Sequence, residues 1–195
     1  MSATIEHTST ARTVDGREVP AAGTYVIDAS HSRVGFVARH LVVAKSRGEF
    51  SSFSGSVTIG EDPLQSSVDV EVDIASVDTR DAKRDEHLRS DDFFAAEQFP
   101  TMHYRSTGVA LGNKGRYVVN GELTVKGVTR PVELLVEFEG GITDPWGGSR
   151  AAFSASAEVN REDFGLTWNQ VLEGGGVVVG KTVTIEIEAE AVLQS

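Results

Sequence analysis

Apolar and polar residues alternate along four segments of the chain, and this two-residue period predicts β-strands with one buried face and one solvent-facing face. The segments span 68–74, 117–125, 132–139 and 183–190. In the first of them, three valines and an isoleucine alternate with Asp69, Glu71 and Asp73. Carboxylates hold polar positions in all four segments. We therefore expect acidic side chains to cover the outside of a sheet.

Turn-forming sequences separate these segments, as an antiparallel meander requires. They lie at 61–63, 113–115, 126–127 and 144–148, and they contain the residue types that tight turns favour. Weaker strand patterns occupy 25–28, 32–40, 48–59, 101–109 and 151–159. This many strands predict an all-β fold with at least eight antiparallel strands. Closure of the sheet into a barrel would leave no exposed edge.

One short helix is predicted over residues 80–89. Asp78 and Thr79 precede it and belong to the residue types that cap helix N-termini, and Asp85 and Arg89 have the spacing of an i,i+4 ion pair. The apolar anchors come late in this region, at Leu88, Phe93 and Phe94. A polar helix anchored in this way suits a lid across one mouth of a barrel; the alternative is a solvated connection on the outer wall.

The N-terminal residues 1–22 are rich in Thr, Ser, Ala and charge and show no hydrophobic period. We expect a flexible tail there and a single domain over residues 23–195. A secretory signal needs an apolar run of about 7–15 residues, which the start of the chain does not provide. No segment approaches the roughly 18 apolar residues of a membrane helix. The expected location is the cytoplasm.

Composition excludes several classes of function. The 29 Asp and Glu residues outnumber the 18 Lys and Arg residues, and the formal net charge is −11. A nucleic-acid partner is not expected, because polyphosphate binding requires a basic surface. The chain has no cysteine, so disulfides, thiolate catalysis and cysteine-ligated metals are excluded.

Motifs for catalysis are not found in the sequence. No serine lies in a Gly-x-Ser-x-Gly setting. The glycine-rich segment 174–180 lacks the Lys and Ser or Thr pair that grips phosphate, and it is interpreted as a flexible loop. The titratable candidates nearest one another in sequence are Asp28, His31 and His40. No enzymatic activity is predicted.

The five histidines, at 7, 31, 40, 87 and 103, do not have the spacing of a metal site, and no metal is predicted. His87 is interpreted as a surface residue and His103 as a hydrogen-bonded strand residue. His40 shares the parity of Val34 and Phe36, so its ring should point into the barrel. There it needs a polar partner or a ligand, and both remain open.

Several short motifs, in one order and over nearly the whole chain, resemble those of the YceI-like proteins. They are Tyr25-x-Ile27-Asp28-x-x-His31-Ser32-x-Val34-x-Phe36, Gly48-x-Phe50-x-x-Phe53-x-Gly55, Asp78-Thr79, Arg84-Asp85-x-His87-Leu88-x-Ser90-x-Asp92-Phe93-Phe94, Phe99-Pro100, Gly121-x-Leu123-Thr124-x-Lys126-Gly127-Val128-Thr129 and Asp163-Phe164-Gly165-Leu166. The resemblance implies an extended, lipocalin-like barrel of eight antiparallel strands. It also implies an interior pocket that takes polyisoprenoid chains, such as polyprenyl phosphates or isoprenoid quinones such as ubiquinone and menaquinone.

The expected function is thus to carry or store an isoprenoid lipid inside the barrel. The alternatives are a ligand-free barrel that acts as a stress or interaction protein, and an enzyme that acts on such a lipid. Inward positions mix large residues with Ala38, Ala155, Ala157, Gly121 and Ala189, which would leave an apolar tunnel. A barrel fully packed by its own side chains is the alternative. A homodimer stays open.

The residues expected to contact the ligand are inward-facing or lie near the barrel mouth. They are Val34, Phe36, Ala38, His40, Phe50, Phe53, Val70, Val72, Phe94, Leu123, Leu134, Val136, Phe138, Phe153, Phe164 and Ile185. Lys45 and Arg47 follow His40, where the chain should round a barrel rim, and could meet a phosphate head group. The alternative is that these two cations pair with acidic outer faces of neighbouring strands.

Overall fold

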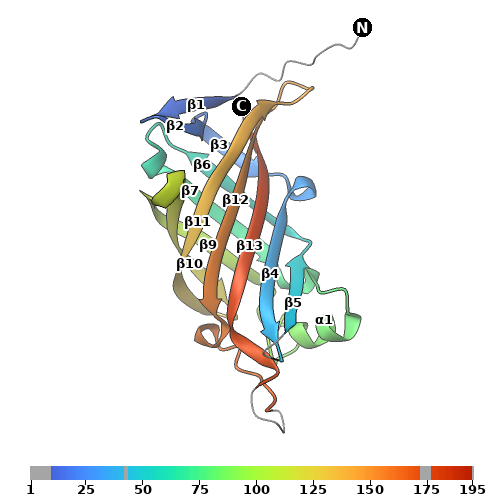
Figure 1. Ribbon diagram of the computed structural model, residues 1–195. Coiled ribbons are helices and arrows are strands. Elements are labelled where there is room, and N and C mark those ends of the chain that lie inside the picture. The colour runs from blue at the N-terminus through green and yellow to red at the C-terminus, as the bar shows by residue number, and fades with distance from the viewer. Residues whose placement is uncertain (1–9, 42–43, 172–176, 195) are drawn as a thin grey trace.

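The structure, a computed structural model, describes residues 10–41, 44–171 and 177–194 (Figure 1). Eight antiparallel strands form a closed barrel in the order β12, β11, β10, β9, β7, β6, β3 and β13, and β13 pairs with β12 to close the ring. The bounds of these strands are β3 (Gly23–Ile27), β6 (Phe53–Ile59), β7 (Ser67–Asp73), β9 (Thr101–Leu111), β10 (Tyr117–Val125), β11 (Val128–Thr143), β12 (Ser149–Asn160) and β13 (Val179–Leu193). The predicted eight-stranded antiparallel barrel is confirmed.

Three strands of the barrel are interrupted. After the 3-10 helix η1 (Ala29–His31), β4 (Arg33–His40) continues along the edge of β13 where β3 left it. Similarly, β5 (Ala44–Phe50) pairs with β4 while β6 pairs with β3, and the short β8 (Val77–Asp78) follows β7 after η3 (Ile74–Ser76). The predicted strand 48–59 is therefore two strands, with a break at residues 51–52.

The connections form where the sequence predicts turns. Lys126 and Gly127, with φ of 50° and 73°, make the two-residue link between β10 and β11, a conformation that suits the twist of a hairpin. The Asp144 side chain accepts bonds from the backbone N–H groups of Trp146 and Gly148, which fixes the turn between β11 and β12. The other two predicted turns contain η2 (Pro63–Gln65) and η4 (Asn113–Gly115), and η5 (Arg161–Phe164) follows β12 where no turn was predicted.

The predicted alternation separates an apolar interior from an acidic exterior. In β11, Val132 and Leu134 are buried whereas Glu133 and Glu137 are exposed. Val72 is likewise buried beside the exposed Glu71 in β7. Each inward residue brings its neighbour outward because successive side chains leave opposite faces of a strand. The carboxylates that dominate the net charge thus lie on the outer wall.

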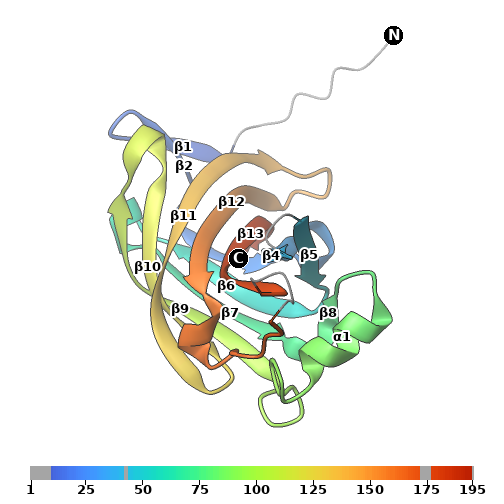
Figure 2. The same cartoon turned by 60° about the horizontal axis from the view of Figure 1, so that its bottom comes forward.

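The helix α1 (Ala82–Arg89) lies beside β8 at the end of the barrel seen in Figure 2. Its cap differs from the prediction, because the Asp81 carboxylate, rather than Asp78 or Thr79, accepts from the first helical N–H groups. The predicted Asp85–Arg89 pair is also wrong. Asp85 is buried and accepts from the Thr79 backbone and hydroxyl groups at 2.8 and 2.6 Å, whereas Arg89 donates to the carbonyl of Ala75. No helix among the described residues is long and apolar enough to cross a bilayer.

A hairpin stands at the opposite end, formed by β1 (Ala11–Val14) and β2 (Arg17–Pro20). Arg12 fastens it by donating to the carbonyls of Gly60 and Glu61, and Val19 is 1% exposed. This differs from the prediction of a flexible tail over 1–22, whose residues 1–9 lie outside the described residues. The hydrophobic pattern of two four-residue strands is too short for periodicity to detect.

Candidate ligand-binding cavity

The barrel encloses a cavity of about 320 Å³ with an almost wholly apolar wall. It runs along the barrel from the hairpin end to the α1 end. Val19, Pro20 and Pro63 line it at the hairpin end, and Leu88 and Phe164 line it at the α1 end. Volumes of this order hold small organic ligands. The interior is therefore hollow rather than filled by side chains.

The predicted apolar contact residues all lie in the wall of this cavity. They are Val34, Phe36, Ala38, Phe50, Phe53, Val70, Val72, Phe94, Leu123, Leu134, Val136, Phe138, Phe153, Phe164 and Ile185. Their contact with a ligand stays a prediction. Strand parity identified those on β4, β7, β10, β11, β12 and β13, because each of these strands turns one face to the axis, whereas Phe94 and Phe164 lie outside the strands. Val19 and Pro20 also line the cavity but were not predicted, because they belong to the N-terminal hairpin that the sequence did not reveal.

Phenylalanines form two groups along the cavity. Near α1, Phe50 lies with its ring centre 5.7 Å from that of Phe36 and 5.9 Å from that of Phe94. Towards the hairpin, the ring centres of Phe138 and Phe153 are 5.7 Å apart. These are ordinary packing distances for aromatic pairs. Phenylalanine rings therefore line both halves of the cavity.

Small residues leave the space open, although not all of those predicted. Ala38, Ala155 and Ala189 line the cavity, whereas Ala157 is buried in the core and does not. Gly121 instead makes room for the Tyr104 ring, which would collide with a Cβ at that position. The Tyr104 hydroxyl donates to the carbonyl of Val119 at 3.0 Å, and burial raises the pKa of Tyr104 to about 12. Gly121 therefore serves packing rather than ligand access.

The predicted head-group cations do not face the cavity. Lys45 and Arg47 are exposed on β5, opposite Arg39 and Val37 in the register with β4. Those partners occupy the face of β4 that is opposite to Phe36 and the cavity. The expectation that the chain is already rounding the rim at these positions was wrong, because β5 begins at Ala44. The orientation of the His40 side chain lies outside the described structure.

A cation that the prediction omitted does reach the cavity wall. Arg161 is 5% exposed and lies at the first position of η5, directly after β12. Its guanidinium donates from Nε to the carbonyl of Gly180 at 2.9 Å and from Nη1 to that of Leu166. Burial lowers the pKa of Arg161 from its usual value. The sequence carried a signal, since Arg161 continues the inward parity of Ala155 and Val159.

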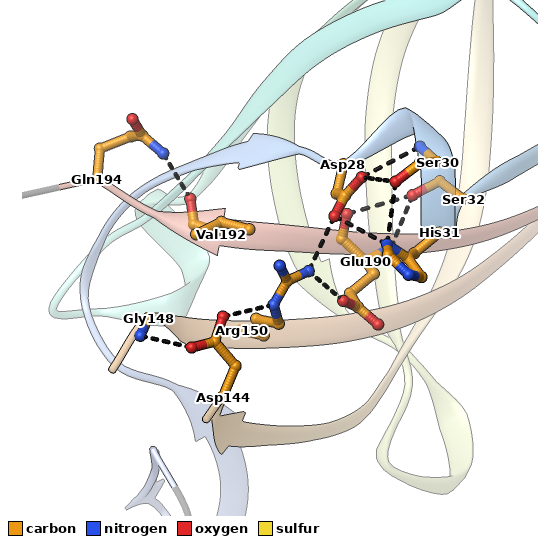
Figure 3. Close-up of polar contacts among 10 residues, drawn as sticks. All are labelled: Asp28, Ser30, His31, Ser32, Asp144, Gly148, Arg150, Glu190, Val192 and Gln194. Carbon is orange, nitrogen blue, oxygen red and sulfur yellow. Dashed lines mark hydrogen bonds and ion pairs between the residues drawn. The ribbon is translucent and has the colours of Figure 1, made fainter. Parts of the chain in front are cut away.

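A network of charged side chains lies around Arg150 at the hairpin end of the barrel (Figure 3). Its guanidinium contacts Asp28 at 2.9 Å, Asp144 at 2.9 Å and Glu190 at 2.5 Å. Hydrogen bonds from Ser30, Arg150 and His31 hold the pKa of Asp28 well below its usual value, and the bond from Arg150 lowers that of Asp144. The network joins η1, the turn after β11, β12 and β13.

The candidate titratable residues do not form one catalytic group. Asp28 and His31 are 2.9 Å apart, but His40 is at the far end of β4. Ligand atoms of Asp28, His31 and Glu190 lie within 4.8 Å of one another, as a metal site would require. Arg150 already engages both carboxylates, so this cluster is explained as an ion-pair network. His103 bonds Asp69 at 2.6 Å, as predicted for a hydrogen-bonded strand residue. His87 bonds Asp92 at 2.9 Å but is half-buried rather than a surface residue, because its ring packs against Phe93 and Trp168.

Comparison with known proteins places this barrel among relatives. The model of the YceI-like domain matches residues 25–191. The chain belongs to the YceI-like family. A YceI-like relative, the UPF0312 protein of Photorhabdus laumondii, is 44% identical over 146 residues, which are 73% of this chain and 76% of that protein. A UPF0312 protein of Vibrio cholerae is 39% identical over 74% of this chain and 78% of its own length.

Solved structures of YceI-like and related proteins share the fold. Campylobacter jejuni YceI superposes with a TM-score of 0.68 at 27% identity and covers 80% of this chain and 90% of its own. Burkholderia cenocepacia BcnA has a TM-score of 0.74 at 22% identity, with coverages of 84% and 98%. A polyisoprenoid binding domain from Saccharophagus degradans has a TM-score of 0.63 at 16% identity, with coverages of 89% and 99%. The N-terminal hairpin lies outside the part that the YceI-like family model matches.

Proposed function

We propose that this protein carries or stores an isoprenoid lipid, a polyprenyl phosphate or an isoprenoid quinone, without chemically changing it. The observation that carries the proposal is the apolar cavity along the barrel axis. A further support is the similar fold of the Saccharophagus degradans domain, which is described as binding polyisoprenoid. Shared fold does not establish a shared ligand, so the ligand must be tested directly.

The energetics of burial are adequate for a carrier. An eight-stranded barrel has an interior at the limit between side-chain packing and room for one slim ligand. A prenyl chain that buries about 200 Å² would gain on the order of 5 kcal/mol at about 25 cal/mol per Å², before the cost of association. That gain gives reversible binding, as delivery of a cargo requires.

The arrangement of titratable groups supports a role without catalysis. General acid–base chemistry requires such groups within hydrogen-bond reach of one reacting atom. Within the described part of the chain, the cluster at Arg150 uses its carboxylates for ion pairs. His103 and Glu188, although they touch the cavity wall, occupy outward positions next to Asp69 and Arg33 respectively.

A mutant that blocks the cavity tests the proposal. Protein purified from cells would be denatured, extracted with organic solvent and examined by mass spectrometry for a stoichiometric isoprenoid. Ala155→Phe places a ring inside the cavity, and we expect it to lose the lipid. Ala152→Phe makes the same substitution on the outer face of β12 and should retain it.

The outcomes separate carriage from other functions. Wild-type protein that yields no stoichiometric lipid and binds no added farnesol would contradict the proposal and favour a ligand-free stress or interaction protein. Equal loading of folded Ala155→Phe and Ala152→Phe would place the lipid elsewhere on the molecule. Conversion of bound lipid into a released product by the purified protein would instead identify an enzyme.

A further inference from the structure

The outer faces of β4 and β5 carry three cations near the point where β4 ends and β5 begins. Arg39 and Lys45 lie directly opposite each other in the β4–β5 register, and Arg47 follows on β5. All three of these tip cations are exposed. Like charges placed directly opposite each other on neighbouring strands are destabilising. Positive charge therefore gathers at one place on a chain whose formal net charge is −11.

The tip cations have no counterion among the described residues. In that part of the chain, their side chains make neither ion pairs nor hydrogen bonds. The next carboxylate on the outer face of β5, that of Glu49, pairs with Arg33 at 2.7 Å. Glu162 of η5 pairs with Lys181 at 2.8 Å. Because these nearby carboxylates are already engaged, the tip cations suit an anionic partner outside the chain.

Exposed apolar side chains lie next to the tip cations. Leu41, which directly follows β4, is 39% exposed, and Val171, between η5 and β13, is 78% exposed. Backbone contacts join their two segments, because the N–H of Leu41 donates to the carbonyl of Val178 at 2.9 Å and Val171 forms a bridge with Val177. Both segments lie at the α1 end of the barrel (Figure 1). This end therefore exposes apolar and cationic groups together.

The backbone conformation of Leu41 makes this exposed leucine unusual. Its φ is 51°, in the left-handed region that glycine and asparagine adopt at lower cost than leucine does. Folding alone gives no reason for a large apolar side chain at an exposed, left-handed position. Contact of that side chain with an apolar partner would give one.

The opposite end of the barrel combines an exposed apolar residue with acidic neighbours. Trp146, in the turn between β11 and β12, is 86% exposed. Three carboxylates surround the single Arg150 beside this turn. The excess of negative charge there would repel an anionic surface, so the two ends differ in the partner that they suit.

We propose that the α1 end of the barrel docks on an anionic phospholipid bilayer, with the tip cations against the head groups and with Leu41 and Val171 inserted between them. A bilayer offers negative charge at its surface and an apolar layer about 5–10 Å below it. A soluble polyanion would neutralise the cations but leave the apolar side chains in water. The proposal goes beyond the carrier function and does not rest on it, because this surface lies outside the cavity.

Vesicles that contain no isoprenoid test docking separately from carriage. Wild-type protein should sediment with phosphatidylcholine vesicles that contain about 30% phosphatidylglycerol, not with phosphatidylcholine alone, and the binding should weaken as salt is added. Each cation near an anionic leaflet raises the affinity about fivefold, so Lys45→Gln with Arg47→Gln should weaken binding about 25-fold. Lys114→Gln with Arg116→Gln is the matched control. It removes the same charge at the same spacing around η4, at the opposite end of the barrel, and should bind as wild-type protein does.

The apolar contacts have their own tests. Leu41→Asn suits the left-handed backbone and should weaken vesicle binding about fivefold, because the exposed part of a leucine side chain no longer leaves water. The chain has no cysteine, so a fluorophore can be attached at one chosen position. Emission from labelled Val171→Cys should shift to the blue on anionic vesicles, whereas that from labelled Trp146→Cys should not.

Every other outcome overturns the proposal. It fails if wild-type protein does not bind anionic vesicles, binds neutral vesicles equally well, or binds heparin but no vesicle, which would favour a polyanionic partner. Equal weakening by the two double variants would show that net charge, rather than this surface, governs binding. A label at position 171 that does not shift, or a shift at position 146, would place the contact elsewhere. Farnesol binding by a protein that binds no vesicle would leave the carrier function intact.

Discussion

Arg150 shows how one residue can connect several segments at a barrel end. Its guanidinium faces three carboxylates, from Asp28, Asp144 and Glu190, and its side chain is only 19% exposed. Charge-assisted bonds at low exposure are stronger than those of surface pairs. Without Arg150, the three acidic groups would repel one another where the chain segments meet.

The Arg150 network predicts acid-sensitive stability. The folded state lowers the pKa values of Asp28 and Asp144 below the usual 3.8. The resulting stabilisation is therefore complete above that value and is lost progressively as the pH falls from it towards the lower pKa values of the folded state. We expect Arg150→Met to lower the urea midpoint of unfolding strongly at about pH 7 and less at about pH 2.5.

Lys181→Met is the matched control for Arg150→Met. Among the described residues, Lys181 pairs with Glu162 alone, and its side chain is 66% exposed. Removal of this pair should change the midpoint little at either pH, because exposed ion pairs contribute little. A loss of stability in Arg150→Met that is the same at both pH values would show that the network contributes packing rather than charge.

Strand parity predicts individual residues well where a regular strand continues, and poorly at its ends. Phe36 and Phe153 could be assigned to the cavity because long alternating strands carry them. Lys45 and Arg47 were misplaced because the sequence did not show that β5 starts as early as Ala44. Arg161 was missed because an arginine in an acidic, turn-like segment is usually expected to be solvent-exposed. Its inward parity was a signal, and the structure shows that hydrogen bonds between η5 and β13 hold its side chain in a buried position.

At the scale of elements, capping residues and charge spacing predict α1 but not its contacts. The helix was predicted within two residues of its N-terminus at Ala82 and at its last residue, Arg89. Leu88, Phe93 and Phe94 reach the cavity wall, so the segment borders the interior. The predicted intrahelical ion pair did not form, since the buried Asp85 has a better partner in Thr79. Local spacing cannot predict such a tertiary contact.

The N-terminal hairpin is an element whose removal should change ligand length. Val19 and Pro20 of β2 line one end of the cavity, and the hairpin lies outside the matched family domain. We expect a variant that lacks residues 1–20 to fold and to bind longer prenols better than wild-type protein does. Each additional buried methylene is worth about 0.8 kcal/mol, so an added five-carbon isoprene unit that is fully buried should gain about 4 kcal/mol, an increase in affinity of roughly 1000-fold.

Titration of both proteins with prenols of increasing length measures this effect. A variant that lacks only residues 1–9 retains β1 and β2 and is the control; its length preference should equal that of wild-type protein. If removal of the hairpin leaves the length preference unchanged, the hairpin does not limit the cavity. If the affinity of wild-type protein already rises with prenol length and reaches no maximum, the tail leaves the barrel by another route.

For the whole molecule, the same alternation determines both the fold and the hollow interior. Eight strands with valine, leucine and phenylalanine inside and carboxylates outside form a closed sheet with no need of disulfides. Closure was predictable from the number of strands and turns. The volume of the cavity could not be predicted, because it depends on how individual side chains pack. The Tyr104 ring fills the space next to Gly121, whereas the small side chains of Ala155 and Ala189 leave space in the cavity.

A cavity of about 320 Å³ should make the stability of the whole barrel depend on its cargo. A ligand that binds only the folded state stabilises it by about 2.7 kcal/mol at 100 times its Kd, which corresponds to a rise in Tm of about 5–10 °C for a chain of this length. We expect delipidated protein to show this rise with farnesol in calorimetry. The Ala152→Phe control should match it, and Ala155→Phe, with its cavity blocked, should show none. A Tm that farnesol does not change in wild-type protein would mean that the barrel is complete without a ligand.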